Sequence, residues 1–315
     1  MVQQKKIFSK RKIVGFFILL IVISLTLYQL ADRYLFEHVE IDNAFVNTKD
    51  TEQSAEPTTS DKNEEKFTTD DWQYNSDSKS IKITKVETGS SNPIVYFVAD
   101  VKIKDANSLK SAFAKNQFGN NIIEYTSTIA SGNKALFAIN GDYYGFRDDG
   151  ITIRNGQIFR NNPARTGLAL LKDGTLKTYE ETETNAEDLL ANGVTQTYSF
   201  GPVLVQNSSA KTDFGHLSID TNFGNRAIDN ANPRTGIGMI SPNHYVFVVV
   251  DGRSREYSEG MTLSEFAKVF EDLGCTDAYN LDGGGSSTMY FMGRVVNNPL
   301  GRNEERGVSD IIYIN

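Results

Sequence analysis

The chain contains few of the residues from which thiol, disulfide and zinc chemistry is built. Cysteine occurs once, as Cys275, so no intrachain disulfide framework can form. Histidine occurs three times, at His38, His216 and His244, without ligand spacing, and no Cys/His cluster indicates a zinc site. No cysteine nucleophile and no plausible serine–histidine pair is evident. The sequence therefore argues against zinc enzymes and against hydrolases of the serine or cysteine type.

Positive charge is also scarce outside the N-terminus. The 315 residues carry 32 Lys and Arg against 40 Asp and Glu, a formal net charge of −8. Because the part expected to fold has no basic stripe, nucleic acid is not an expected partner. The composition, with 39% hydrophobic and 23% charged residues, is that of a globular protein of one large domain or two ordinary ones.

One long hydrophobic run is present. Ile13 to Leu30 form 18 residues without a charge, just enough to cross a hydrocarbon core of ~30 Å. The basic residues 1–12 predict that this end stays in the cytoplasm and that the rest lies outside. A cleaved signal peptide is the alternative, but the bulky, charged residues that follow offer no good cleavage site. We expect a single-pass membrane anchor at 13–30 with an extracellular domain, and the lack of disulfides fits a Gram-positive surface.

The chain beyond this run divides by composition. Residues 31–71 are acidic and polar with few large apolar side chains, which predicts a disordered tether. Residues 72–315 are expected to form a single domain. Together with the N-terminal transmembrane helix, we predict the α+β class: mixed, mostly antiparallel sheets with a few packed helices.

Local patterns support this class. The dipeptides Asn155-Gly156 and Asp173-Gly174 lie between alternating runs and predict two-residue hairpins. Thr262 to Leu273 predicts the clearest helix, with a Thr262–Glu265 capping box and an apolar stripe of helical period. A further helix is expected from Asn107 to about Lys115.

A glycine-rich loop follows the strand predicted before Asp282. Three successive glycines leave backbone amides uncovered, and with two serines they would form a concavity suited to an anion. No Gly-Lys-Ser/Thr follows, so this is not a Walker A loop, and the β-type run after it excludes a Rossmann fingerprint. A plain tight turn is the alternative.

Four polar clusters are expected at strand ends, where sites assemble on a rigid scaffold. Arginines bind phosphate oxygens bidentately, and carboxylates serve in glycosyl transfer, so the residue types indicate a substrate with both phosphate and sugar. Turn chemistry or local ion pairing remain alternatives for each cluster, and Arg147 is expected to be solvated. The predicted catalytic residues are Asp282, Asp251 and Asp142, and the predicted substrate- and phosphate-binding residues are Asn140, Gly141, Arg234, Thr235, Arg253, Gly283, Gly284, Gly285, Ser286 and Ser287.

The segments AINGDYYG and YNLDGGGSS also echo one another, since each places a Gly/Asp/Asn loop after a helix and a short strand. Two related halves of the chain, or a common βα pattern that occurs twice, explain this equally well.

These motifs together resemble the phosphodiester glycosidase family, which includes the N-acetylglucosamine-1-phosphodiester α-N-acetylglucosaminidases and many bacterial surface proteins. The resemblance rests on AINGDYYG (138–145), NPRTGIG (232–238), VVDGRS (249–254), GMTLSEFA (260–267) and YNLDGGGSS (279–287), in that order. The family often has Gly or Ala at the position of Asp142, which leaves open whether Asp142 has a shared catalytic role.

The resemblance implies hydrolysis of a sugar-1-phosphodiester in a cell-surface glycan such as teichoic acid, with the phosphate left on the other alcohol. A non-catalytic glycan- or phosphate-binding protein on the same fold is one alternative. A metal-dependent phosphodiesterase that cuts P–O is another. Aspartates could ligate a divalent cation, Ca²⁺ or Mg²⁺, although no known loop pattern indicates one.

Overall fold

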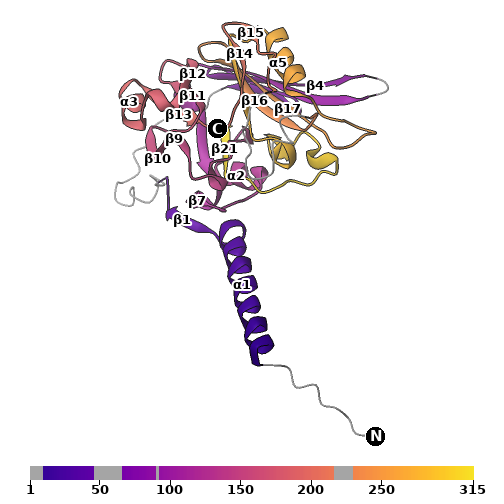
Figure 1. Ribbon diagram of the computed structural model, residues 1–315. Helices are drawn as coiled ribbons and strands as arrows, with labels where there is room; N and C mark the ends of the chain where they lie inside the picture. Colours follow the sequence, from indigo (N-terminus) through magenta and orange to yellow (C-terminus); the bar gives the residue numbers. More distant parts are fainter. Residues whose placement is uncertain (1–9, 46–65, 90–91, 216–229) are drawn as a thin grey trace, which may run out of the picture. The chain divides into compact units, whose positions relative to one another are not determined.

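The computed structural model describes residues 10–45, 66–89, 92–215 and 230–315 (Figure 1). Helix α1 (Lys10–Tyr34) belongs to an N-terminal unit that ends at His38. Within it, Val14–Asp32 has a mean hydropathy of 2.3, and none of it is buried. A helix of this kind serves either as a signal sequence or as an anchor. The residues from Val39 onward form a second unit that contains all the predicted site residues.

Two large sheets organise this second unit. The first has nine strands in the order β15 (Ser209–Ala210), β14 (Val203–Gln206), β18 (Asp277–Leu281), β16 (Arg234–Ser241), β17 (His244–Val250), β5 (Ile94–Ile103), β4 (Lys79–Thr88), β3 (Gln73–Ser76) and β2 (Phe67–Asp70). The second has five, in the order β20 (Arg294–Val295), β19 (Met289–Phe291), β8 (Phe137–Asn140), β21 (Asp310–Ile314) and β6 (Lys110–Phe113). The central pairs β16–β17, β16–β18 and β8–β21 are antiparallel.

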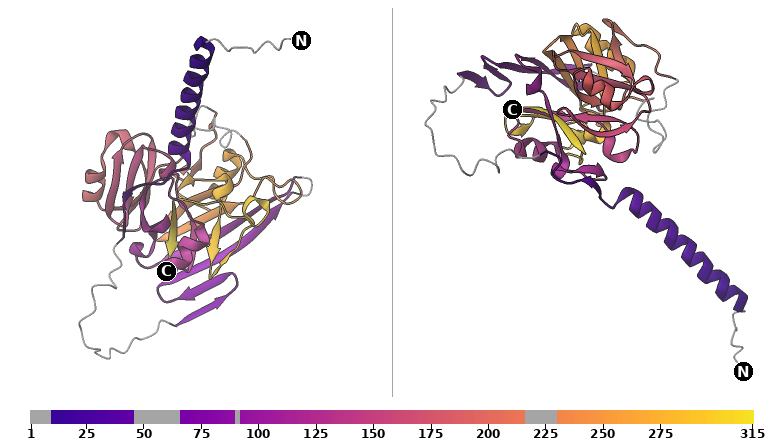
Figure 2. Two further views of the ribbon diagram at one scale, coloured as in Figure 1. Left: turned by 90° about the horizontal axis from the view of Figure 1, so that it is seen from below. Right: turned by 90° about the vertical axis from the view of Figure 1, so that its left-hand side faces the viewer.

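The two sheets share one apolar core. In β17, Phe247 and Val249 point into this core with Ile139 and Ile312 of the smaller sheet, whereas Val248 points the other way. This two-residue alternation is what a strand buried on both faces requires. Figure 2 shows the strands of both sheets from two further sides.

A helix covers the outer face of each sheet. Helix α5 (Leu263–Asp272) packs on the nine-stranded sheet through Phe266 and Phe270, and α2 (Thr126–Gly132) packs on the five-stranded sheet through Ile129. The capping box predicted for α5 is present, since Thr262 and Glu265 bond each other's backbone N–H. The mixed α+β class with mostly antiparallel sheets and few helices is therefore confirmed.

A smaller group of strands lies beside these layers. The strands β9 (Gly150–Arg154) and β10 (Gln157–Asn162) pair around Asn155-Gly156, and β11 (Thr166–Leu171) pairs with β12 (Leu176–Glu180) around Asp173-Gly174. Both predicted hairpins are confirmed. Strand β13 (Val194–Tyr198) joins β11, and α3 (Ala186–Ala191) packs with β9 and β13.

The helix predicted from Asn107 to Lys115 is wrong. A short 3₁₀ turn at Ala106–Ser108 leads instead into β6, whose residues pair with β21 at the edge of the smaller sheet. Three of the four β6 residues are buried. Sheet pairing therefore overrides a local pattern that also fitted a helix.

The disordered tether predicted for 31–71 also needs correction. Strand β1 (His38–Ile41) pairs with β7 (Phe118–Asn120), and β2 lies in the nine-stranded sheet. After β1, the Ala44 N–H donates to the Asn116 carbonyl over 2.8 Å, and the Phe45 ring stacks on Phe113. The composition of residues 31–71 is polar on average, and this average does not reveal the few apolar residues that pack against the domain. Residues 46–65 lie outside the described part.

Candidate active site

The ends of β8 and β18 are joined by one buried side chain, Asn140. Its Nδ2 donates to the carbonyl of Asp282 over 2.7 Å. Its Oδ1 accepts from Thr235 Oγ1 at 2.8 Å and from the Thr288 N–H at 3.2 Å. Asn140 and Thr235 are both fully buried. The structure thus places these two predicted binding residues against the glycine loop, where their hydrogen bonds support it.

The glycine loop forms a single 3₁₀ turn, Gly284–Ser286, and uses much of its own backbone. The Gly284 N–H donates to the Pro233 carbonyl at 2.9 Å, and the N–H groups of Ser286 and Ser287 donate to carbonyls inside the loop. The predicted concavity of uncovered amides is therefore corrected: these three N–H groups have internal partners.

The glycines instead allow two close approaches. A Cβ at Gly283 would lie 2.8 Å from the Pro233 carbonyl oxygen. At Gly284, φ is +62°, and a Cβ would lie 2.9 Å from Nη2 of Arg253. Larger residues would push both neighbours away, so the loop needs glycine here because the protein packs tightly around it.

Asp282 sits at the start of this loop with its side chain 13% exposed. Its Oδ2 accepts from Ser286 Oγ at 2.6 Å and lies 3.3 Å from Nη2 of Arg306. Burial raises the pKa of Asp282, while Arg306 and the Ser286 hydroxyl oppose that rise. The carboxylate is thus enclosed, yet its strongest partner is an arginine whose side chain is 47% exposed.

Arg306 and Arg253 lie near Asp282, and a third arginine, Arg234, neighbours Arg253. Arg306 also donates to Ser286 Oγ at 2.6 Å, and Arg253 donates to Asn232 Oδ1 at 3.2 Å. Arg234 is 3% exposed and donates Nε to the carbonyl of Met261. The heads of Arg253 and Arg306 face solvent, whereas Arg234 lies behind them.

The arginines repel one another. Burial, and then the charge of Arg253, lower the pKa of Arg234 to about 10. Burial, and then the charge of Arg306, lower the pKa of Arg253. Like charges held this close destabilise the protein by themselves, and a bound anion would relieve the repulsion.

Arg147 belongs to the same region, against the expectation that it is solvated. Its guanidinium lies 5.2 Å from the ring centre of Tyr143 and 5.0 Å from that of Phe200. Burial, followed by the charge of Arg165, lowers its pKa, and Asp282 is among the carboxylates that oppose this. No sequence pattern marks Arg147, because Phe200 meets it only in the folded structure. Arg306 was missed for the same reason, since it follows no predicted strand.

Asp251 is held on all sides. Its carboxylate accepts from Tyr257 Oη at 2.9 Å, from Asn297 Nδ2 at 2.8 Å and from the Asn298 N–H at 2.9 Å. It is 1% exposed, and burial raises its pKa. This geometry fixes the 297–298 loop.

Asp142 lies in a buried ion-pair network. Its Oδ2 is 3.0 Å from Nη2 of Arg154 and accepts from the Ser199 N–H at 3.1 Å. Arg154, which is fully buried, also contacts Asp310 at 2.8 Å. Gly141 is required here because a Cβ would lie 2.1 Å from Asp310 Oδ1. Asp142 and Gly141 thus sit in a structural cluster.

Within the described residues, no group of three or more His, Cys, Asp or Glu side chains is arranged to hold a metal ion.

The structure defines an α+β protein of mostly antiparallel sheets with polar loops at its strand ends, and sequence comparison identifies its family. The profile of the phosphodiester glycosidase family matches residues 133–315, so the chain belongs to that family. This agrees with the resemblance drawn from the motifs.

Individual relatives agree with the fold. The SPβ prophage-derived uncharacterized protein YomE of Bacillus subtilis (strain 168) is 30% identical in an alignment of 244 residues that covers 70% of this chain. The chain spans only 36% of that protein's length. The catalytic domain of zebrafish N-acetylglucosamine-1-phosphodiester α-N-acetylglucosaminidase, auto-inhibited by its pro-peptide, superposes with a TM-score of 0.61 at 22% identity, over 76% of this chain and 84% of that one. A Burkholderia pseudomallei K96243 protein described as exported gives a TM-score of 0.53 at 17% identity, over 72% and 75%.

Proposed function

We propose that the chain hydrolyses a sugar-1-phosphodiester by breaking the bond between the anomeric carbon and the phosphate oxygen. The observation that carries this proposal is the enclosed carboxylate of Asp282 near Arg306 and Arg253, with Arg234 next to Arg253. Asp282 promotes the attack of water on the anomeric carbon, and the arginines neutralise the phosphate. Family membership supports the same reaction class.

The exposed heads of Arg253 and Arg306 are the phosphate-binding groups. Both reach the loop at Gly284 and Ser286, and guanidinium groups match phosphate oxygens in pairs. Arg234 is the positioning residue behind them, and its charge adds to the field that the phosphate enters. The phosphate-binding side of the site is shaped by the loop glycines together with Ser286 and Ser287.

Asp282 is the general base in this mechanism. It accepts a proton from the water whose oxygen attacks the anomeric carbon. The C–O bond breaks, and its electron pair leaves with the phosphate monoester. Because the second pKa of a phosphate monoester is ~6, the leaving group needs little protonation; it needs charge neutralisation, which the arginines supply. A base whose pKa is raised by burial is also stronger.

Two of the three predicted catalytic aspartates take supporting roles in this proposal. Asp251 holds the 297–298 loop, and Asp142 holds Arg154. Asp282 has a different set of partners: Ser286 Oγ and the half-exposed Arg306 contact its carboxylate, and the Gly283 N–H also lowers its pKa.

Isotope labelling tests the bond that is cleaved. The full-length chain in detergent is incubated with N-acetylglucosamine-1-phosphomethanol in ¹⁸O-labelled water. Label in the released sugar supports the proposal, and label in the phosphate identifies a phosphodiesterase that cuts P–O. Nuclear magnetic resonance of the fresh product reports the anomer: attack by water predicts inversion, whereas retention would make Asp282 a nucleophile.

A binding protein without activity is the remaining alternative. Glycan that binds and is never cleaved, by the wild type or by Asp282→Asn, would establish it across a panel of sugar-1-phosphodiesters and teichoic acid fragments.

We further propose that α1 is an uncleaved anchor and that the domain faces the extracellular side. The apolar stretch of α1, its basic N-terminal flank and a structural relative described as exported support this. Membrane fractionation followed by protease treatment of intact cells tests it. A domain recovered from the medium without residues 1–30 would show cleavage.

A further inference from the structure

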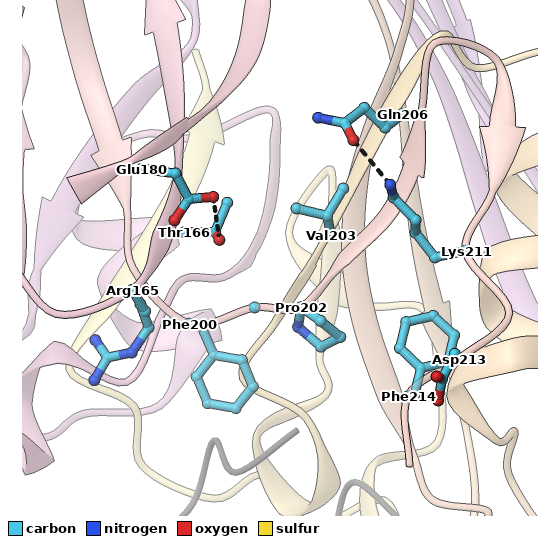
Figure 3. Close-up of a pocket in the computed structure, with 11 residues that line it drawn as sticks. Arg165, Thr166, Glu180, Phe200, Pro202, Val203, Gln206, Lys211, Asp213 and Phe214 are labelled. Atoms are coloured by element: carbon cyan, nitrogen blue, oxygen red, sulfur yellow. Dashed lines mark hydrogen bonds between the residues drawn. The ribbon is translucent and has the colours of Figure 1, made fainter. Parts of the chain in front are cut away.

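A separate cavity of about 370 Å³ lies next to the candidate active site (Figure 3). Phe200 is part of its wall, and the Arg147 guanidinium lies 5.0 Å from the centre of that ring. Arg147 in turn interacts electrostatically with Asp282. The lining residues fall between Arg165 and Phe214 in sequence, so Asp282 is not among them. The cavity is therefore a site beside the candidate active site and not a part of it.

The cavity wall has an apolar part and a polar part. In Figure 3 the rings of Phe200, Pro202 and Phe214 lie in the lower half of the view between the charged ends of Arg165 and Asp213, and the polar ends of Glu180, Gln206 and Lys211 lie in the upper half. Apolar rings flanked by polar groups suit a sugar ring, which has an apolar C–H face and an edge of hydroxyl groups. The volume of the cavity is within the range of small-ligand sites.

The charges of the lining cancel. Arg165 and Lys211 oppose Glu180 and Asp213. Arg165 is 2.6 Å from an Asp149 oxygen, and the Lys211 ammonium donates to Gln206 Oε1 at 2.9 Å. This balance contrasts with the arginine cluster at Asp282 and favours a neutral ligand over a second phosphate.

We propose that this cavity is a subsite for a neutral sugar ring next to the unit whose bond is cleaved. The substrate is then an oligosaccharide or a polymer and not a small sugar phosphate. The assignment of the cleaved bond rests on the proposed function, but sugar binding in the cavity is measurable without any hydrolysis.

The test uses a glycan array that carries neutral and phosphorylated bacterial oligosaccharides, probed with the full-length chain in detergent. Asp282→Asn is expected to bind neutral oligosaccharides as the wild type does. Phe214→Ala and Gln206→Ala are expected to weaken that binding at least about tenfold, as removal of an anchor side chain commonly does. Phe67→Ala is the matched control, because Phe67 is exposed on β2 and stacks on Tyr74.

Kinetics separates the two proposals. Phe214→Ala should raise KM for an oligosaccharide-1-phosphodiester and leave kcat/KM for N-acetylglucosamine-1-phosphomethanol unchanged. The subsite would be overturned if Phe214→Ala changed the kinetics of both substrates to the same extent. It would also be overturned if the array bound no neutral glycan, or bound only phosphorylated glycans and lost them steeply at high salt. Neutral glycan binding without cleavage would retain the subsite and reject the proposed hydrolysis.

Discussion

The loop after β8 and the loop after β18 have similar sequences, but they hold their aspartates differently. In the first loop, Asp142 contacts the fully buried Arg154 and the Ser199 backbone. In the second, Asp282 contacts the Ser286 hydroxyl and the half-exposed Arg306. A rigid set of partners suits a carboxylate that supports structure. A partner that can move suits one that must exchange protons with a ligand.

The largest difference is expected between Arg154, which contacts the loop after β8, and Arg253, which lies against the loop after β18. Arg154→Met leaves two buried carboxylates without their cation and should lower the free energy of unfolding by about 3–5 kcal/mol. Arg253→Met removes an exposed guanidinium and should leave stability nearly unchanged while activity falls. Chemical denaturation of both variants measures this. Equal stability losses would erase the distinction between the loops.

The next largest difference is expected between Asp282 and Asp142, in activity and in stability. Asp282→Asn should lower kcat at least ~10²-fold, the lower bound for loss of a general base. Because burial raises its pKa above the unfolded value, ionised Asp282 destabilises the fold at neutral pH. The same change should therefore hold or raise the melting temperature, whereas Asp142→Asn should lower it. A folded Asp282→Asn variant with the wild-type rate contradicts the assignment.

Removal of the Arg306 charge gives a smaller, pH-dependent effect. Arg306→Gln should lower kcat/KM about tenfold, since one phosphate donor is lost. Arg306 also lowers the pKa of Asp282, so its loss should raise that pKa further. The base must be ionised, and the acid limb of the pH–rate profile should therefore move to higher pH. A limb that stays in place would show that Asp282 does not govern it.

The smallest effect is expected at Gly284. Gly284→Ala should cost about 1 kcal/mol of stability because φ is +62°. It should also lower activity several-fold, because the new methyl group would displace Arg253. Gly293→Ala is the control, since φ is +88° there and nothing lies within 4 Å of the new Cβ. Activity loss in both variants would point to backbone strain alone.

The sequence predicted what depends on local patterns. The Asn155-Gly156 turn requires positive φ at both residues and occurs where expected. The Thr262–Glu265 capping box is equally local. The start of the glycine loop after β18 was also found, because a strand boundary and a glycine run mark it.

What the sequence did not show depends on partners distant in the chain. Arg154 meets Asp310, 156 residues away, and this contact decides the environment of Asp142. Arg306 reaches Asp282 only because β21 pairs beside β8. Strand β6 looked helical because its pairing with β21 leaves no local signature.

The segment just after β1 has a practical consequence for preparing the domain without α1. Phe45 stacks on Phe113 and meets Phe159 edge-on, and Tyr144 of the β8 loop contacts the same Phe113 ring. A truncated protein that began at Trp72 would lose Phe45 and leave strand β7 unpaired, which exposes aromatic surface and a free strand edge. It would also lack β2, and the loop after β8 would lose part of the packing around Phe113. A truncation that begins before Val39 keeps these contacts and removes only α1.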